Sequence, residues 1–175
     1  MGRKHALVVA GRGALGVIND RGGSVDGTGS DKGAAEHVVD AIRAAGGEAV
    51  ADTNSVATPE GGAAIVQTAI DAFGRVDIVI NNAGILRDKS FSKMPLDDFR
   101  LVIDVHLMGA AICTQAVLTI MRAQKYGRVV LTTSSSGRYG NCGQANCGSP
   151  QMALVGVRQT WRLDGAGDGH PGRCL

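Results

Sequence analysis

Hydrophobic positions along the chain switch repeatedly between helical spacing and short apolar runs. Helical spacing predicts helices over residues 3–13, 34–45, 59–73, 96–124 and 149–162. Short β-branched runs predict strands over residues 14–20, 48–52, 76–80 and 128–132. The stretch 96–124 is expected to be two helices that meet near 104–106. The run VDIVI at 76–80 is typical of a strand buried on both faces.

Strands and helices that alternate at these lengths predict an α/β fold, a Rossmann-like doubly wound parallel sheet with right-handed crossovers. One domain is expected over residues 1–163. The segment 164–175 has no periodicity and is predicted to be a disordered tail. Ligands bind such sheets beyond the carboxyl ends of the strands. Small or polar residues stand at those ends, over 19–20, 52–55, 81–84 and 133–136.

Composition and charge exclude several classes of protein. The 18 basic and 16 acidic residues give a net charge of +2, which offers no electrostatic basis for binding nucleic acid or an anionic membrane. Aromatic residues make up only 3% of the chain, too few for a surface that stacks single-stranded bases. No apolar run approaches the ~18 residues of a membrane span. The four cysteines lack zinc spacing, so we expect a cytoplasmic protein with reduced thiols and no metal.

The glycine-rich stretch GRGALG at 11–16 has two interpretations. It matches a dinucleotide fingerprint, which requires a helix after the last glycine and an acidic residue roughly 20 positions later, but Asp20 follows after four. In the other register, residues 3–13 form a helix and 15–20 the second strand of a Rossmann unit. Asp20 can then bind both ribose hydroxyls of an adenosine and repel a 2′-phosphate, so NAD is preferred over NADP. Alternatively, Asp20 only caps the next turn.

Later motifs resemble those of the short-chain dehydrogenase/reductase family. They are NNAG at 81–84, a serine cluster at 134–136, and GRYGNCGQANCGSPQ at 137–151. Within the family, the segments most similar to the 3-hydroxyacyl-CoA dehydrogenase domain of peroxisomal multifunctional enzymes and bacterial relatives are 19–23, 81–91, 105–109 and 139–146. The resemblance covers residues 2–164. It implies an oxidoreductase that uses NAD to interconvert a secondary alcohol and a ketone, such as a 3-hydroxyacyl thioester.

The resemblance also implies which residues bind the cofactor. Asp20 holds the adenosine ribose. Asn54 stands where the family usually has an aspartate near the adenine, and Ser55 follows it. The residues expected along the cofactor are Asn82, Ala83 and Gly84, the glycine allowing close approach. Their alternative role is to end a buried strand.

The catalytic positions depart from the family pattern. Ser134 is expected to hydrogen-bond the substrate oxygen. Thirteen residues later Cys147 replaces the family's tyrosine, and four residues further Gln151 replaces its lysine. A neutral glutamine cannot lower the pKa of a neighbour, and loss of a positioned acid/base costs roughly 10²- to 10⁴-fold in rate. His106 stands where most of the family places an asparagine in a proton relay, although a histidine within a helix is more often a packing residue.

The same resemblance implies an incomplete fold. In the second register the family's first strand, its phosphate loop and its C-terminal strands have no counterpart, so a truncated gene product is one hypothesis. An oxidoreductase of low or no activity toward a small-molecule substrate is the first functional hypothesis. The alternative is a catalytically silent homologue, a binding or oligomerisation module. It would form a homo-oligomer or pair with a full-length relative through helices 96–124 and 149–162.

Overall fold

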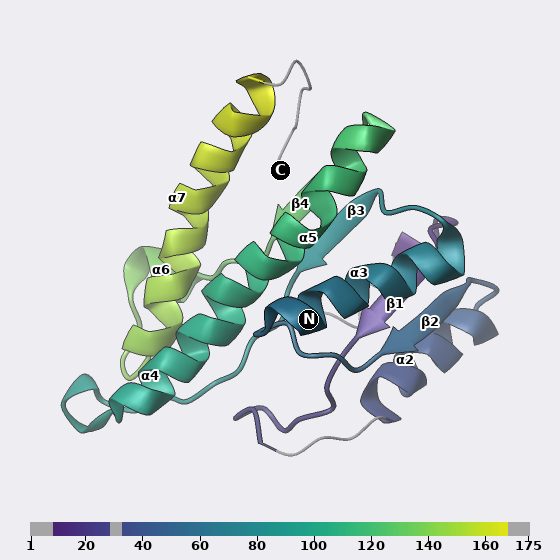
Figure 1. Cartoon of the computed structure of the whole chain (residues 1–175). Coiled ribbons are helices and arrows are strands. Elements are labelled where there is room, and N and C mark those ends of the chain that lie inside the picture. The colour runs from purple at the N-terminus through teal and green to yellow at the C-terminus, as the bar shows by residue number, and fades with distance from the viewer. Residues whose placement is uncertain (1–8, 29–32, 168–175) are drawn as a thin grey trace.

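Two pairs of parallel strands form the sheet layer in a computed structural model, which describes residues 9–28 and 33–167 (Figure 1). The strands are β1 (Gly16–Asn19), β2 (Ala49–Asp52), β3 (Ile78–Asn81) and β4 (Arg128–Leu131). β1 pairs with β2, and β3 pairs with β4. The predicted α/β fold with parallel strands is confirmed. The sheet is nevertheless divided, because no strand within the described residues hydrogen-bonds both pairs.

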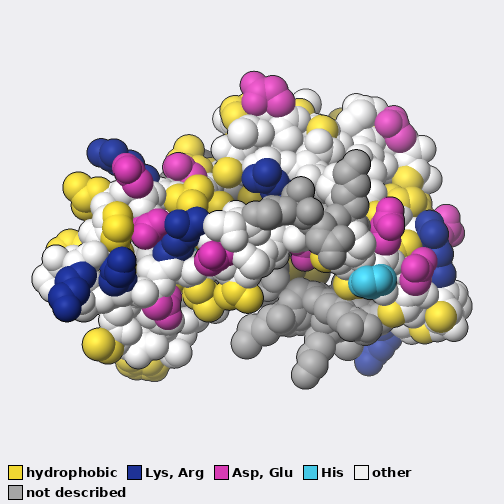
Figure 2. Space-filling model, turned by 90° about the horizontal axis from the view of Figure 1, so that it is seen from below, with side chains coloured by type: hydrophobic (Ala, Val, Ile, Leu, Met, Phe, Trp, Pro, Cys, Tyr) yellow, Lys and Arg dark blue, Asp and Glu magenta, His cyan; other side chains and the backbone are white. Residues whose placement is uncertain are grey.

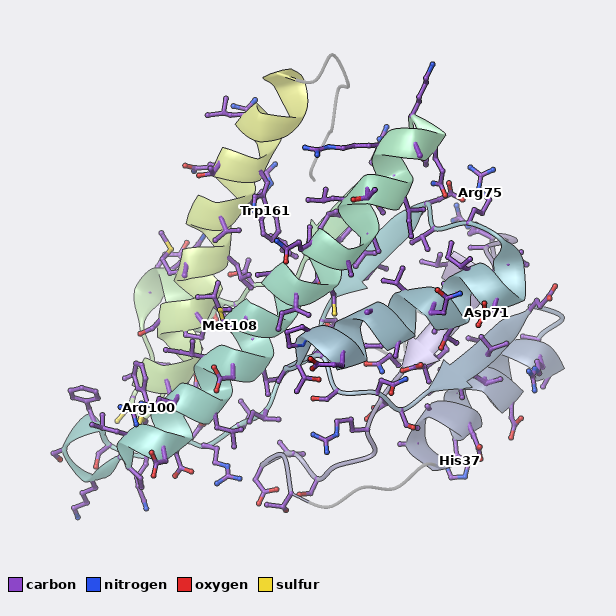
Figure 3. The ribbon with its side chains drawn as sticks, viewed as in Figure 1. His37, Asp71, Arg75, Arg100, Met108 and Trp161 are labelled. Carbon is purple, nitrogen blue, oxygen red and sulfur yellow. The ribbon has the colours of Figure 1, made fainter. Side chains whose placement is uncertain are left out.

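Helices pack around these strands. They are α2 (Gly33–Ala44), α3 (Pro59–Phe73), α4 (Leu96–Ile103), α5 (Gly109–Gln124), α6 (Ser135–Tyr139) and α7 (Ala145–Gly167), with a 3₁₀ turn η1 (Phe91–Lys93) and a π-turn η2 (Asp104–Met108). α2 lies against β1 and β2, α3 lies beside α5, and α7 contacts α4 and α6 (Figure 1). In Figure 3, Trp161 projects from α7 on the side that faces α5.

Two separate clusters of buried side chains hold these elements together. The larger lies between α3, α5 and the β3–β4 pair and contains Val66, Val76, Val117, Met121 and Val129. The smaller lies between α2 and the β1–β2 pair and contains Ala10, Val39, Ile42 and Ala49. Each strand pair therefore has its own apolar core.

The helix predicted over 59–73 is confirmed with those bounds. Thr58 Oγ1 accepts a hydrogen bond from the backbone N–H of Gly61 at 3.2 Å, which satisfies a donor that the first turn leaves unpaired. Gly74 ends the helix with φ 72°, and its N–H bonds to the carbonyl of Ile70. Gly61 has no room for a side chain, because an added Cβ would lie 1.9 Å from the Ser55 carbonyl oxygen. The start of α3 is therefore fixed against the loop before it.

The two helices predicted over 96–124 are also confirmed, and they meet at the π-turn Asp104–Met108. By length and average composition alone, Leu96–Gln124 could cross a membrane, although it contains no uninterrupted apolar run of the predicted length. Polar residues interrupt the apolar run, but they do not lower the mean hydropathy of the segment below that of a membrane span. Val117 and Met121 of α5 pack in the larger core, as side chains of a core helix do.

The C-terminal helix begins earlier and ends later than predicted. It starts at Ala145, where Gly148 N donates to Gln144 O at 2.8 Å. Pro150, close to the predicted start at 149, lies inside the helix. The helix continues to Gly167 and so overlaps the start of the tail predicted over 164–175. The remainder of the predicted tail, 168–175, lies outside the described residues.

The strand over 76–80 is less buried than predicted. Ile78 is 47% exposed and Ile80 is 39% exposed, whereas Val79 packs in the larger core. Helices α3 and α5 supply that core from one side, which leaves the side of β3 that carries the two isoleucines in contact with solvent. The expectation of burial on both faces is therefore wrong.

The stretch GRGALG leads into a strand, not into a helix. Val9 and Ala10 are helical, Gly13 adopts φ 83° and β1 begins at Gly16. The interpretation as a dinucleotide fingerprint is therefore contradicted. In the other register, Val9 and Ala10 are helical as predicted, but 11–13 form a turn, so the helix ends before the predicted residue 13. Residues 3–8 of the predicted helix lie outside the described residues.

Candidate functional site

The carboxyl ends of the strands point to one side of the molecule, the lower side in Figure 1. Figure 2 looks at that side, and acidic and basic side chains are interspersed over the part that described residues form. Backbone hydrogen bonds connect the segments that follow the strands. Leu86 N donates to Val25 O at 2.8 Å, and Asp20 N donates to Asp52 O at 3.0 Å. The site residues predicted at the strand ends therefore lie along one edge, and His37 projects from α2 on the same lower side (Figure 3).

Asp20 follows β1 and is exposed. Its Oδ1 accepts a hydrogen bond from the N–H of Gly22 at 2.8 Å, so the predicted turn cap is present. The cap uses one carboxylate oxygen, and the exposed group can still accept bonds from a ligand.

Asp52 is an important site residue that the sequence analysis did not single out. It ends β2 with 6% of its surface exposed, and its carboxylate accepts hydrogen bonds from Asn19 Nδ2 at 2.7 Å and Thr68 Oγ1 at 2.9 Å. Asn54 donates twice more, from its backbone N at 2.9 Å and from Nδ2 at 2.8 Å. Burial alone would raise the pKa of Asp52, but these four hydrogen bonds outweigh it and lower the pKa below the usual aspartate range.

Ser55 and Asn82 are occupied by local contacts. Ser55 Oγ accepts from Ala57 N at 3.3 Å in the turn before α3. Asn82 Oδ1 accepts from Thr132 Oγ1 at 3.2 Å, which joins the ends of β3 and β4. These contacts match the role of ending a strand or a turn, and cofactor binding by these residues stays a prediction.

Gly84 makes room for a side chain of the protein itself. An added Cβ would lie 2.8 Å from Cε1 of His106, while the neighbouring Ala83 is exposed. Nε2 of His106 lies 3.0 Å from both the N and the O of Ile85, so the imidazole holds this peptide segment. Burial lowers the pKa of His106, and the hydrogen bond to Ile85 only partly opposes it. The packing role of His106 is therefore present, whatever its part in a relay.

Ser134 is the N-cap of α6, a short helix that the sequence analysis missed. Its Oγ accepts from the N–H of Ser136 at 3.0 Å, and the residue is half-buried. The hydroxyl hydrogen is thereby left available for another acceptor, as a substrate-binding role requires.

Cys147 is almost completely buried, with 1% of its surface exposed. Its Sγ lies 3.9 Å from the carbonyl oxygen of Ile85 and 4.0 Å from Oδ1 of Asp88. Burial raises the pKa of the thiol, and the nearby Asp88 carboxylate raises it further. The thiol therefore stays protonated near neutral pH and points toward protein acceptors.

Gln151 lies one turn after Cys147, and its Oε1 is a buried acceptor with no hydrogen-bond partner in the described part of the chain. The backbone carbonyl of Gln151 accepts from Thr133 Oγ1 at 3.0 Å, which ties α7 to the segment after β4. A buried unpaired carbonyl costs roughly 1–3 kcal/mol, so this atom offers a place for a ligand hydroxyl.

The surroundings of the site include a cavity but, within the described residues, no metal site. A cavity of about 420 Å³ lies between α6 and α7, but Ser134, Cys147 and Gln151 do not line it. The described residues contain no group of three potential metal ligands.

Comparison with known proteins identifies the family. The sequence profile of short chain dehydrogenases matches residues 4–169. The chain belongs to the short-chain dehydrogenase family. This short-chain dehydrogenase is 53% identical over 166 residues to peroxisomal multifunctional enzyme type 2 of Drosophila melanogaster, which covers 95% of this chain and 27% of that protein.

Solved structures agree with that assignment. A short chain dehydrogenase from Mycobacterium avium has a TM-score of 0.87 and 36% identity, over 96% of this chain and 60% of the other. NAD⁺-bound xylitol dehydrogenase has a TM-score of 0.86 and 28% identity, over 95% and 61%. This short-chain dehydrogenase therefore spans less than two thirds of the length of these relatives.

Short-chain dehydrogenases typically use a nicotinamide dinucleotide, and the described residues fit one only in part. The exposed Asp20 carboxylate and Asn54 amide suit an adenosine, and the unpaired Oε1 of Gln151 suits a ribose hydroxyl. The buried Cys147 does not suit the proton transfer that a phenol performs in the family. The site therefore has features for binding a dinucleotide but lacks the family's acid/base.

Proposed function

We propose that this short-chain dehydrogenase binds NAD in preference to NADP. Its activity toward secondary alcohols or ketones, with 3-hydroxyacyl thioesters as the substrate class, is low or absent. A bound nicotinamide ring supplies the hydride acceptor or donor of such a reaction. The protein's own residues determine whether the accompanying proton can move.

The adenosine end supports the preference for NAD. Asp20 is an exposed carboxylate directly after β1, and its backbone N–H bonds to the end of β2. A carboxylate accepts hydrogen bonds from the two hydroxyls of an unmodified ribose, whereas it repels the 2′-phosphate of NADP.

The buried thiol of Cys147 is the observation on which the low activity rests. A tyrosine in this position works because its acidic hydroxyl reaches the substrate oxygen beside a lysine ammonium. Here the thiol is shorter, its pKa is raised by burial and by Asp88, and it faces Ile85 O. Gln151 can accept a hydroxyl hydrogen bond but carries no charge to lower a neighbour's pKa. Ser134 alone can orient a substrate oxygen but cannot exchange a proton with it at neutral pH.

Two further properties belong to the same proposal. The chain acts in the cytoplasm, although relatives include proteins named as peroxisomal. It forms a homo-oligomer or pairs with a full-length relative through its 96–124 and 149–162 helices. Co-purification with tagged chain tests the pairing, and isolation of monomers alone would contradict it.

Thermal unfolding with excess NAD or NADP tests the binding. A ligand that binds only the folded protein raises the unfolding midpoint. We expect NAD to raise it more than NADP, and Asp20→Asn to reduce the difference between them. His37→Asn, which changes an exposed residue of α2, is the control. No shift with NAD or with ADP-ribose would contradict the proposal.

NADH formation from a 3-hydroxyacyl-CoA tests the low activity. The double variant Cys147→Tyr/Gln151→Lys restores the phenol and the ammonium, and we expect it to exceed the wild-type rate by ~10²-fold or more. Gln151→Lys alone is the matched control and should remain near the wild-type rate. Equal rates for the wild type and a stably folded, NAD-binding double variant would contradict the assignment of the defect to these positions.

A further inference from the structure

Asn54, at the predicted adenine end of the site, donates two hydrogen bonds to the carboxylate of Asp52. We propose that Asp52 is a positioning residue that holds the Asn54 amide with its oxygen outward, so that the site accepts adenine and discriminates against 6-oxopurines. The proposal rests on the dinucleotide binding proposed above and adds the source of its base selectivity.

The hydrogen bonds define the orientation of the amide. An asparagine side chain presents a donor at Nδ2 and an acceptor at Oδ1, and either can face outward. Here Nδ2 of Asn54 donates to Oδ2 of Asp52 at 2.8 Å, while the Asn54 backbone N donates to Oδ1 at 2.9 Å. A carboxylate only accepts, so the flipped amide would place two acceptor oxygens against each other. Asp52 therefore selects one of the two orientations.

Asp52 is itself held firmly. Its side chain is buried, and Thr68 of α3 and Asn19 of β1 each donate to it. Asn19 Nδ2 also lies 2.9 Å from the Asn54 carbonyl oxygen, which fixes the backbone of Asn54 as well. The network thus connects β1, β2 and α3 to one exposed amide.

The outward atom of that amide is a hydrogen-bond acceptor. Asn54 is exposed, and its Oδ1 contacts no donor within the described residues. Adenine carries an amino group at position 6, whereas hypoxanthine and guanine carry a carbonyl oxygen there. An outward Oδ1 accepts a hydrogen bond from the amino group and repels the carbonyl. Asp20, at the neighbouring strand end, lies where the ribose of the same adenosine would bind.

Calorimetric titration with NAD and with nicotinamide hypoxanthine dinucleotide tests the proposal. The two ligands differ only in the base, where hypoxanthine has a carbonyl in place of the 6-amino group of adenine and a hydrogen on the adjacent N1. For the wild type we expect NAD to bind ~10-fold more tightly, the effect of one hydrogen bond gained and one repulsion avoided. In Asp52→Asn, the new amide can donate to Asn54 Oδ1 and allow the flip, so the ratio should fall below ~3.

Two further variants separate positioning from stability. Thr68→Val removes another donor to Asp52 without touching Asn54, so it should lower the unfolding midpoint and keep the wild-type ratio. Asp52→Asn/Asn54→Asp places an acceptor-only side chain at position 54 and should restore the preference for NAD. If Asp52→Asn does not fold, Asn54→Ala, which leaves the carboxylate network in place, should bring the ratio near one.

Each result has a defined meaning. An unchanged ratio in folded Asp52→Asn, or in Asn54→Ala, would overturn the positioning role. Equal wild-type affinity for both dinucleotides would overturn the selectivity but leave the proposed function standing. No binding of either dinucleotide to the wild type would overturn the proposed function, and this inference with it.

Discussion

At the residue scale, the side chain of His106 restricts position 84 to glycine. The imidazole fills the space that a side chain at Gly84 would need, and its Nε2 lies 3.0 Å from both the backbone N and the backbone O of Ile85, one of which it bonds in a given tautomer. The family resemblance implies that the missing side chain allows a cofactor to approach closely. In the structure, a side chain at Gly84 would collide with His106 of the same chain. This contact could not be predicted without knowing which helical segment faces NNAG.

The histidine should make stability depend on pH. Burial lowers the pKa of His106 in the folded protein, so the unfolded chain binds the proton more readily. The free energy of unfolding should therefore decrease as pH falls below the ordinary histidine pKa of about 6.5, and level off below the folded value. Urea unfolding at pH 7.5, 6.0 and 5.0 measures this dependence.

His106→Asn and His37→Asn provide the comparison for that measurement. The first variant should lose much of the decrease between pH 7.5 and 5.0. The second changes an exposed histidine on α2 and should retain it. The same slope in both variants would show that other groups cause the pH dependence.

At the scale of elements, α3 depends on the contact of its first turn with the preceding loop. Gly61→Ala would place a Cβ against the Ser55 carbonyl oxygen, and overpacking of this kind costs ~1–3 kcal/mol or more. Gly156→Ala is the matched control, because Gly156 is exposed in α7 with open space around it and alanine favours a helix by ~1 kcal/mol. Chemical unfolding should show the first variant less stable than wild type and the second as stable or more so. Equal stability of the two variants would contradict the tight contact.

The elements that sequence analysis located best carry their own end signals. Thr58, Pro59 and Gly74 mark both ends of α3 locally, and the helix has the predicted bounds. Proline is typical of the first turn of a helix, but Pro150 lies inside α7, which begins at Ala145, before the predicted start at 149. In the folded chain this proline is buried inside the helix, and Ser149 Oγ donates to the carbonyl of Ala145 at 2.7 Å. Tertiary packing outweighed the local signal there.

The location of the site could be predicted from the sequence, but its hydrogen-bond network could not. Its position at the carboxyl ends of the strands followed from the fold class, and Asp20 and Ser134 lie there as expected. The network around Asp52 was not predictable, because it joins Asn19, Asn54 and Thr68 from three elements. An acidic residue that ends a buried strand is the signal that could have indicated it.

At the scale of the whole molecule, the two apolar cores should differ in stability. The larger core is closed by α3, α5 and both strands of one pair, whereas the smaller depends mainly on α2. Regions with fewer buried apolar contacts open at lower free energy. We therefore expect amide hydrogens of β1, β2 and α2 to exchange at least ~10-fold faster than those of β4 and α5. Hydrogen exchange followed by mass spectrometry measures both sets, and uniform protection would contradict independent cores.

The π-turn at Asp104–Met108 should determine where this chain tolerates the deletion of a single residue. A π-turn contains one residue more than a regular helical turn, so the helices on either side keep their faces while the surplus is absorbed locally. Loss of one residue inside the turn would leave α4 and α5 in phase, at the expense of the position of His106. Loss of one residue at the start of α5 would rotate Val117 by about 100° relative to α4 and take it out of the core. The turn is therefore the point in Leu96–Gln124 where a change in length is absorbed most readily.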